Sequence, residues 1–340
     1  MEQQLTREKL KQLRALVGEG DRVAIVVQDD PDPDALSSAI ALRTLLGRNK
    51  LTTPIFSFAP VTRPENRTMV HLLEIEVAPA DTEELASFDR IAMVDVAPPY
   101  FNGRLKRVDV VVDHHPGYVG GQAVFEDVRP GYGATATIMT EYLVCAGERI
   151  SERLATALLY GIRTDTLMLS RRVTDHDLQA FVHLYPHANY NLLKQMDRPE
   201  LPLNFARVLA KAMRRLKTTD GIVVLYLGAV DRDDLIVQMA DFCLQFEEVE
   251  WTVVGGKLGP NLVLAVRNNG LGRDSAGEMV RRLFGELGSA GGHREMAKAV
   301  VPFSIWRKRE GTVRQAEVEA RLRGLVSAYL ANLSAEAQAG

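Results

Sequence analysis

The chain has 340 residues, of which 46% are hydrophobic and 25% charged, proportions typical of a globular protein with a sizeable core. Its net charge of −3 excludes a globally basic surface, so we expect no long duplex nucleic acid as a partner. The only two cysteines, Cys145 and Cys243, are far apart, which excludes a disulfide framework and a zinc-cysteine site. No apolar run approaches the roughly 18 residues of a spanning helix, and residues 1–20 read as a polar amphipathic helix. We therefore expect no membrane partner and a cytoplasmic protein.

The first half of the chain alternates short β-branched runs with helical patterns. Strands are predicted at residues 22–28, 53–58, 90–96 and 108–115, with helices between them at 35–46 and 64–75. Continuous apolar strands separated by helices indicate a parallel sheet covered on both faces. We therefore predict an α/β fold with a Rossmann-like first domain. The pattern is helical again from about 133 to 162 and on to about 217.

A second unit follows. Strands are predicted at 221–228, 249–256 and 261–269, helices at 232–246, 274–285 and 312–336, and a loop at 288–303. Adjacent strands joined by short turns predict a smaller mixed α/β domain. We divide the chain into a first domain at 1–190, a helical linker at 191–217, a second domain at 218–310 and a C-terminal helix and tail at 311–340. The amphipathic helices at the two ends offer a surface for a homodimer.

Acidic residues and histidines follow three of the predicted strands. They are Asp29, Asp30, Asp32 and Asp34 after the first strand, Asp95 after another, and Asp113, His114 and His115 at the end of a third. Asp165 lies in a turn after a helix. Ligands of open parallel sheets bind beyond the carboxyl ends of the strands, so these side chains can converge. Mg²⁺ and Mn²⁺ prefer carboxylate oxygens, Mn²⁺ also accepts imidazole, and two adjacent ions need a bridging carboxylate. The pattern indicates a two-metal site.

A structural interpretation competes with this one. An Asp-rich turn before a helix is explained about as well by N-capping and by the helix dipole. A single aspartate at a strand end, such as Asp95, has structural roles more often than metal-binding ones. However, His114 and His115 beside Asp113 have no obvious packing purpose, and they favour the metal interpretation.

The motifs also resemble those of a known family, the DHH phosphoesterase superfamily, in the branch with a DHH-associated C-terminal domain. Four segments resemble its metal-site motifs in the right order: "DDPDPDALSSA" (29–39), "MVDVAPP" (93–99), "DHHP" (113–116) and "GIRTDT" (161–166). "AVRNN" (265–269) and "GSAGGHREMAKA" (288–299) resemble the arginine strand and the glycine-rich loop of the associated domain. The resemblance covers residues from about 20 to 305.

The resemblance implies two Mn²⁺ ions, with Mg²⁺ as the alternative. One ion would be held by Asp34, Asp95, His114 and Asp165, and the other by Asp32, Asp95 and Gln28. Asp95 would bridge the ions, and a water between them would attack phosphorus. His115 would lie near the phosphate oxygens, and Asp113 would orient a neighbouring histidine. The family usually has a histidine where this sequence has Gln28, whose amide oxygen is a weaker, neutral donor.

Two glycine-rich segments are candidates for anion binding. Gly291 and Gly292 lack a Cβ and would let a phosphate or base approach the backbone, with His293 and Arg267 as donors. On the residues alone a plain glycine turn is the simpler explanation, and the resemblance reverses that preference. The segment 131–137, "GYGATAT", would either present its amides to a phosphate or simply cap a helix.

The resemblance implies a metal-dependent, manganese-using phosphoesterase that cleaves short nucleotides in a cleft between the domains. The substrates would be nanoRNA, pAp, linear or cyclic dinucleotides, or a short single-stranded oligonucleotide, as in the nanoRNase (oligoribonuclease) and pAp phosphatase branch that is related to the RecJ exonucleases. The first domain would be catalytic and the second would bind substrate. The alternatives are an inorganic pyrophosphatase or exopolyphosphatase, and a nucleotide-binding regulatory protein with an impaired metal site.

Overall fold

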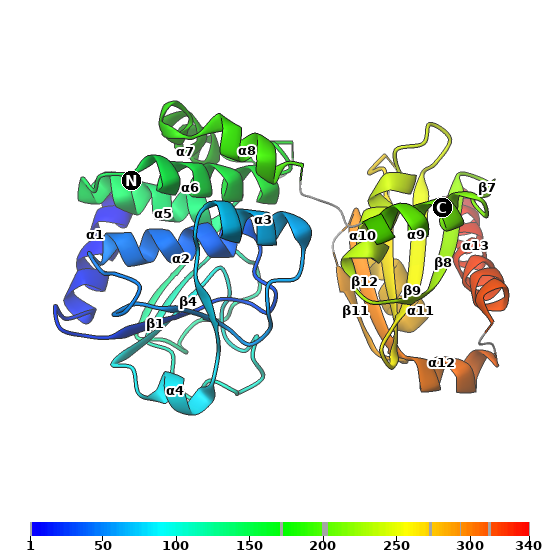
Figure 1. The fold of residues 1–340 in the computed structure, drawn as a ribbon, viewed down its shortest axis with the longest axis horizontal. Coiled ribbons are helices and arrows are strands. Elements are labelled where there is room, and N and C mark those ends of the chain that lie inside the picture. Colours follow the sequence, from blue (N-terminus) through cyan, green and yellow to red (C-terminus); the bar gives the residue numbers. More distant parts are fainter. Residues whose placement is uncertain are drawn as a thin grey trace. The chain divides into compact units, whose positions relative to one another are not determined.

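The chain forms two compact units, Met1–Glu200 and Leu201–Gly340, which Figure 1 shows in a computed structural model. The structure describes residues 2–170, 173–198, 203–271, 274–292, 294–311 and 314–339. Each unit has its own sheet and its own hydrophobic core. The predicted fold class, a parallel α/β domain followed by a mixed α/β domain, is confirmed.

The first unit is built on a parallel sheet, whose described strands are arranged in the order β3-β2-β1-β4-β5-β6. This is the doubly wound order, in which the crossover direction changes between β1 and β4 and opens a binding crevice there. Val, Ile and Ala dominate the central strands, which are buried on both faces. The strands are β1 (Val23–Val26), β2 (Ile55–Ser57), β3 (Val77–Pro79), β4 (Arg90–Val94), β5 (Val110–Asp113) and β6 (Phe125–Val128).

Helices cover both faces of this sheet. One face packs on α1, α2, α5 and α6 in a core that includes Leu36, Tyr142 and Leu158, and the other packs on α4 through Leu85 (Figure 1). The helices are α1 (Glu2–Leu16), α2 (Pro33–Leu45), α3 (Pro64–Leu72), α4 (Thr82–Ala86), α5 (Thr135–Ala146), α6 (Glu152–Asp165), α7 (Asp175–Leu184), the 3₁₀ turn η1 (Tyr185–His187) and α8 (Tyr190–Met196).

The second unit has a mixed sheet in the order β11-β12-β10-β9-β8-β7, in which β8 and β9 are parallel and the other pairs antiparallel. Helices α11 and α13 pack on one face, and α9 and α10 on the other. The strands are β7 (Thr218–Thr219), β8 (Ile222–Val230), β9 (Trp251–Leu258), β10 (Asn261–Asn268), β11 (Ser289–Gly292) and β12 (Met296–Pro302). The helices are α9 (Leu203–Met213), α10 (Asp234–Cys243), α11 (Ala276–Phe284), α12 (Phe303–Glu310) and α13 (Gln315–Ala339).

The helical segment expected between the domains divides between the two units. Helix α8 packs on α3 and α6 of the first unit, whereas α9 packs on β8 of the second. The apolar stripes of the terminal helices are also used inside their own units: Leu13 of α1 and Val318 of α13 are fully buried. Those stripes are therefore not available as the dimer surface that the sequence suggested. No helix in the described ranges is long and apolar enough to cross a membrane.

The prediction of a loop at residues 288–303 is wrong. Residues 289–292 and 296–302 form β11 and β12, which pair as an antiparallel hairpin. The alternating burial of β12 carries the period-two signal of a half-buried strand, but the glycines and the charged residues before it obscured that signal. A smaller correction concerns Asp165, which ends helix α6 instead of lying in the turn after it.

Candidate metal centre

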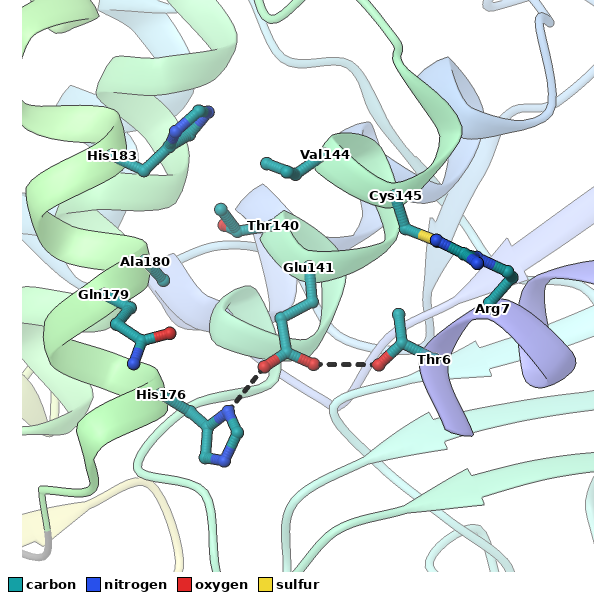
Figure 2. A pocket seen from close by; sticks show the side chains of 10 residues that line it. All are labelled: Thr6, Arg7, Thr140, Glu141, Val144, Cys145, His176, Gln179, Ala180 and His183. Carbon is teal, nitrogen blue, oxygen red and sulfur yellow. Dashed lines mark hydrogen bonds and ion pairs between the residues drawn. The ribbon is translucent and has the colours of Figure 1, made fainter. Parts of the chain in front are cut away.

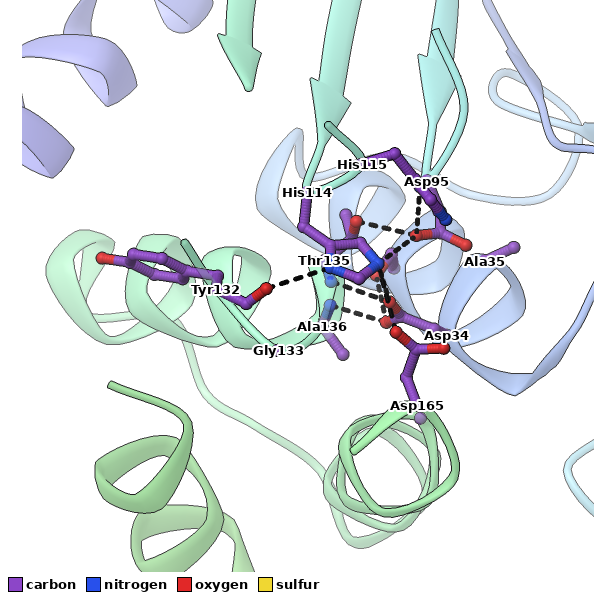
Figure 3. A network of polar contacts seen from close by, with 12 residues as sticks. Asp34, Ala35, Asp95, His114, His115, Tyr132, Gly133, Thr135, Ala136 and Asp165 are labelled. Atoms are coloured by element: carbon purple, nitrogen blue, oxygen red, sulfur yellow. Dashed lines mark hydrogen bonds and ion pairs between the residues drawn. The ribbon is translucent and has the colours of Figure 1, made fainter. Parts of the chain in front are cut away.

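The candidate metal residues come from four elements that meet at the carboxyl edge of the first sheet. Asp34 lies in the first turn of α2, Asp95 directly follows β4, His114 directly follows β5, and Asp165 is the last residue of α6. Figure 3 shows their side chains pointing toward one another. The cluster lies beside the point between β1 and β4 where the strand order reverses, which is where α/β sheets bind ligands.

The Nε2 atom of His114 lies at the middle of this cluster. It is 3.1 Å from Asp165 Oδ2, 3.6 Å from Asp95 Oδ1 and 3.9 Å from Asp34 Oδ2. It is buried, yet it has no hydrogen bond of good geometry to any described residue. An imidazole nitrogen that is buried, unpartnered and surrounded by three carboxylates has the environment of a metal ligand.

Burial and mutual repulsion disfavour the ionised forms of the carboxylates in this cluster. Burial and the nearby carboxylate of Asp165 raise the pKa of Asp34 to about 7. Burial and the neighbouring aspartates, Asp34 first, raise the pKa of Asp95 well above its usual range. Burial alone would lower the pKa of His114, but Asp165 and Asp34 raise it to about 9. A divalent cation among these groups would reverse the raised pKa values of the carboxylates, because it favours their ionised forms.

The turn at 132–136 holds three of these side chains in place. The amides of Thr135 and Ala136, at the start of α5, each donate to Asp34 at 2.7 Å, and the Thr135 hydroxyl donates to Asp95 at 2.8 Å. The Nδ1 atom of His114 lies 3.1 Å from the carbonyl of Tyr132, which makes Nδ1 the protonated nitrogen and leaves Nε2 free as a ligand (Figure 3). Two amides of the segment "GYGATAT", those of Thr135 and Ala136, thus donate to Asp34 and are not available to a phosphate.

Asp177 anchors this turn from the first turn of α7. Its fully buried carboxylate accepts from the amide of Gly133 at 3.0 Å, from the Thr137 hydroxyl at 2.6 Å, and from the Thr174 amide and hydroxyl. Sequence reasoning missed Asp177. The available signal was Thr174-x-x-Asp177, the pattern of a capping box, which the structure contains.

Tyr132 is anchored separately by Glu141 of α5. The carboxylate of Glu141 contacts Thr6 at 3.0 Å and His176 at 2.7 Å, which Figure 2 shows at the wall of a cavity between α1, α5 and α7. The His176 ring stacks on the Tyr132 ring, with centroids 4.7 Å apart, and the Tyr132 hydroxyl donates to Glu141. The carbonyl that orients His114 therefore belongs to a residue whose side chain is fixed.

The remaining aspartate and Gln28 form a second group beside the cluster. Asp32 is the N-cap of α2 and accepts from the amide of Ala35 at 3.0 Å, so the N-cap interpretation of the Asp-rich turn holds for this residue. Its other oxygen accepts from the Gln28 side-chain amide at 2.8 Å. Burial, followed by Asp165, raises the pKa of Asp32. Asp30 instead accepts hydrogen bonds from the amide and the hydroxyl of Thr62.

His115 and Asp113 form a hydrogen-bonded pair at the edge of the cluster. Nδ1 of His115 is 2.8 Å from Asp113 Oδ1, and that oxygen also accepts from the amides of His114 and His115. The side chain of His115 is 46% exposed, whereas Asp113 is buried. The hydrogen bond to Asp113 raises the pKa of His115. The pair presents an oriented imidazole to solvent beside the carboxylates.

The backbone at Asp95 is in the left-handed region, with φ of +61°. An L-residue with a side chain rarely adopts this conformation, and it persists where the surrounding structure imposes it. Here the Asp95 amide donates to the carbonyl of Val112 on β5, which continues the pairing of β4 with β5 as far as Asp95. The Asp95 carboxylate lies 3.6 Å from Nε2 of His114.

Two of the four residues predicted to bind substrate in the second unit, Arg267 and Gly292, have structural roles. Arg267 donates through Nε to Asp241 at 2.6 Å, so its cation is already paired. Gly291 and Gly292 lie in the edge strand β11. A Cβ at Gly292 would lie 2.4 Å from Ala297 Cα, so the hairpin itself requires this glycine, whereas Gly291 faces open space. His293 lies outside the described residues.

The donor set fits divalent metal ions. Two groups have ligand atoms within 4.8 Å of one another, Asp34 with His114 and Asp165, and Asp95 with His114 and His115. Three carboxylates and one imidazole suit Mn²⁺, and Mg²⁺ prefers the same carboxylates. The unpartnered Nε2 of His114 is the observation that hydrogen bonding within the protein does not explain.

The first unit is thus a doubly wound α/β domain, and a cluster of aspartates and histidines lies at its switch point. Residues 22–162 match the model of the DHH family, N-terminal domain. These residues are therefore a DHH-family N-terminal domain, and the DHH family predicted from the motifs is confirmed for this part of the chain.

Two curated relatives match most of the chain. An uncharacterised protein of Methanocaldococcus jannaschii is 31% identical over 318 residues, which is 88% of this chain and 65% of the relative. Cyclic-di-AMP phosphodiesterase GdpP of Geobacillus thermodenitrificans is 26% identical over 310 residues, which is 84% of this chain and 46% of GdpP. The chain thus spans 65% and 46% of the lengths of these relatives.

Solved structures share the fold of both units. An exopolyphosphatase-related protein from Bacteroides fragilis matches with a TM-score of 0.73 and 13% identity, covering 94% of this chain and 96% of that one. RecJ from Thermus thermophilus, solved in complex with Mn²⁺, matches with a TM-score of 0.50 and 17% identity, covering 93% of this chain and 54% of RecJ. At these identities the likeness concerns the fold alone.

Proposed function

We propose that the protein is a metal-dependent phosphoesterase that hydrolyses short nucleotide substrates. The observation that carries the proposal is the buried, unpartnered Nε2 of His114 among the carboxylates of Asp34, Asp95 and Asp165. Membership of the DHH family and the cyclic-di-AMP phosphodiesterase named among the relatives support a phosphodiester substrate. Linear or cyclic dinucleotides, nanoRNA and pAp are the substrates that we infer.

The protein residues divide the work at the site. Asp34, Asp95, His114 and Asp165 would hold one ion, and Asp32, Asp95 and Gln28 the other. Bound divalent ions would supply Lewis acidity toward the phosphate and toward water. His115, oriented by its hydrogen bond to Asp113, which also raises its pKa, would donate a hydrogen bond to a phosphate oxygen and stabilise the negative charge that develops there. The second unit would hold the rest of the substrate.

A hydrolysis screen tests this proposal. The substrates are pAp, a pApA-type dinucleotide, cyclic di-AMP, a short oligoribonucleotide and pyrophosphate, each with Mn²⁺, with Mg²⁺ and with chelator. We expect metal-dependent cleavage of at least one nucleotide. Asp165→Ala should reduce that turnover by at least about 100-fold, because it removes a carboxylate from the cluster, while leaving the thermal unfolding curve nearly unchanged, because the side chain is 33% exposed.

The matched control is Asp197→Ala. Asp197 is also a partly exposed aspartate of the first unit, and it pairs with Arg163 at 2.7 Å. It is not one of the candidate metal ligands. This variant should keep wild-type turnover. Wild-type activity in Asp165→Ala would contradict the metal assignment, and cleavage of pyrophosphate alone would identify an inorganic pyrophosphatase.

The glutamine at position 28 favours a second candidate function, that of a nucleotide-binding regulatory protein. The residue concerned is Gln28. Its amide nitrogen is bonded to Asp32, and amide oxygen is a weak metal donor, so one ion could be lost. Such a protein would bind nucleotide with one ion or none and would show no turnover with any substrate of the screen.

A further inference from the structure

A cavity of about 480 Å³ adjoins the metal cluster within the first unit. The part of its lining that belongs to the candidate site consists of Gln28, Asp95, Asp113 and His115. The other lining residues lie on two loops, within 96–102 after β4 and within 116–118 after β5. If a phosphate binds at the metal cluster, the group attached to it on this side would therefore lie between these two loops.

The lining is unsuited to further phosphates. Among the described residues that line the cavity, none is a lysine or an arginine. The charged side chains there are Asp95, Asp113 and His115, all of which belong to the site itself. A buried phosphate chain needs cationic or multiple hydrogen-bond donors, and two carboxylates would repel it. Prolines 98, 99 and 116 and two tyrosines instead offer flat apolar surfaces to a neutral group.

The two tyrosines of the cavity are held in place before any ligand arrives. Tyr100 is 47% exposed, but its ring packs edge-on against the buried Phe101, with centroids 4.9 Å apart. The hydroxyl of Tyr118 donates to Glu126, which also accepts from backbone amides of the same loop. Rigid aromatic surfaces bind planar groups with little loss of conformational entropy.

One polar group on the loop after β4 remains available. The Asn102 side chain makes no hydrogen bond within the described part of the chain, and it offers both a donor and an acceptor. A flat aromatic surface with one amide nearby is the combination that recognises a nucleobase by stacking and by its polar edge.

We propose that this cavity is the subsite for the nucleoside attached to the scissile phosphate, with Tyr100 as its stacking surface and Asn102 as its polar contact. The proposal rests on the proposed phosphoesterase function, and it assigns residues of the first unit to the recognition of the nucleoside part of the substrate.

The test compares wild type with Tyr100→Ala and Tyr100→Phe, using pApA and tripolyphosphate in Mn²⁺. Tyr100→Ala should raise KM for pApA by about tenfold, the typical effect of losing one base–aromatic contact, with kcat changed much less. Tyr100→Phe keeps the ring and should behave like wild type. Tyr190→Ala is the control, because Tyr190 is also 47% exposed but lies on α8.

A binding measurement distinguishes a wrong subsite proposal from a wrong enzyme proposal. AMP binding is measured by calorimetry in the presence of Mn²⁺. If no substrate is cleaved, the proposed function fails, and weaker AMP binding by Tyr100→Ala still supports the subsite. Equal AMP affinity in wild type and Tyr100→Ala overturns the subsite. So does a wild-type preference for tripolyphosphate over pApA.

Discussion

Gln28 stands where the family that the motifs resemble usually has a histidine, so replacing it tests its role in metal binding. Gln28→His should tighten the binding of the second Mn²⁺, because an imidazole nitrogen is a stronger donor to Mn²⁺ than an amide oxygen. We expect a rise in affinity of roughly tenfold or more in a calorimetric Mn²⁺ titration.

Gln28→Leu is the matching loss-of-donor variant. It has a similar size and should weaken the same binding step while leaving the first step unchanged. If wild type, Gln28→His and Gln28→Leu bind Mn²⁺ with the same stoichiometry and affinity, Gln28 is not a ligand, and its role is limited to the hydrogen bond with Asp32.

Asp177 is expected to act on the metal site without touching it. Asp177→Ala leaves the buried amide of Gly133 and the hydroxyl of Thr137 without their acceptor. Losing hydrogen bonds to a buried carboxylate should lower the free energy of unfolding by about 3 kcal/mol. Because the released turn holds Asp34 and His114, Mn²⁺ affinity should also fall, measured by titration below the unfolding temperature.

Asp175→Ala controls for the loss of an acidic residue from the same helical turn. Asp175 is exposed and complements only the helix dipole, so its loss should cost less than about 1 kcal/mol. Equal effects of the two variants would contradict the anchoring role of Asp177.

The ligand residues could be predicted because side-chain type and strand order carry the information. Aspartates and histidines that follow parallel strands must meet at one edge, which is where Asp34, Asp95 and His114 lie. The groups that orient them could not be predicted, because the carbonyl of Tyr132 and the amides of Thr135 and Ala136 have no side-chain signature. The ion pair of Arg267 with Asp241 also depends on tertiary contact alone.

Among the elements, the contact between α2 and α6 depends on one glycine. A Cβ at Gly161 would lie 2.5 Å from Ser37 Oγ and 3.1 Å from Asp34 Cα. Gly161→Ala should therefore push α2 away from α6, lower the free energy of unfolding by about 1 to 3 kcal/mol and weaken Mn²⁺ binding through Asp34. Thermal unfolding and metal titration measure the two effects.

Gly324→Ala provides the comparison at a helical glycine with room. Gly324 lies within α13, and a Cβ there would meet no atom within 4 Å. Alanine should stabilise this helix by up to about 1 kcal/mol, because glycine is the poorer helix former. Stabilisation by Gly161→Ala as well would show that the two helices do not require close approach.

Strands within a continuous apolar run were predictable, and strands outside such a run, or beside glycines and charged residues, were not. The runs that became β1, β4, β9 and β10 are continuous and β-branched. The short β3 and the acidic β6, "FEDV", lack such a run, since neighbouring strands supply most of their stabilisation. Strand β12, "MAKAVVP", alternates in burial but not in residue type, and its lysine and the glycines before it hid it among loop residues.

For the whole molecule, two separate cores predict two unfolding events. The core around Leu36 and Tyr142 belongs to the first unit, and the core around Trp306 and Leu322 to the second. We expect two transitions in scanning calorimetry, since each unit buries its own apolar residues.

Mn²⁺ should raise the midpoint temperature of the first unit's transition alone, because all six candidate ligands lie in the first unit. At about 100 times its Kd a ligand adds about 2.7 kcal/mol, which shifts a unit of this size by about 5 to 10 °C. Asp165→Ala should abolish that shift. An equal shift of both transitions would contradict metal binding confined to the first unit.

The central claim is that the cluster around His114 is a divalent metal centre, and anomalous scattering from crystals grown with Mn²⁺ tests it most directly. Data collected above and below the manganese edge should show a peak in contact with Asp34, Asp95, His114 and Asp165. A second, weaker peak is expected beside Asp32 and Gln28. Manganese bound elsewhere, with no peak at the His114 Nε2 atom, would contradict the claim.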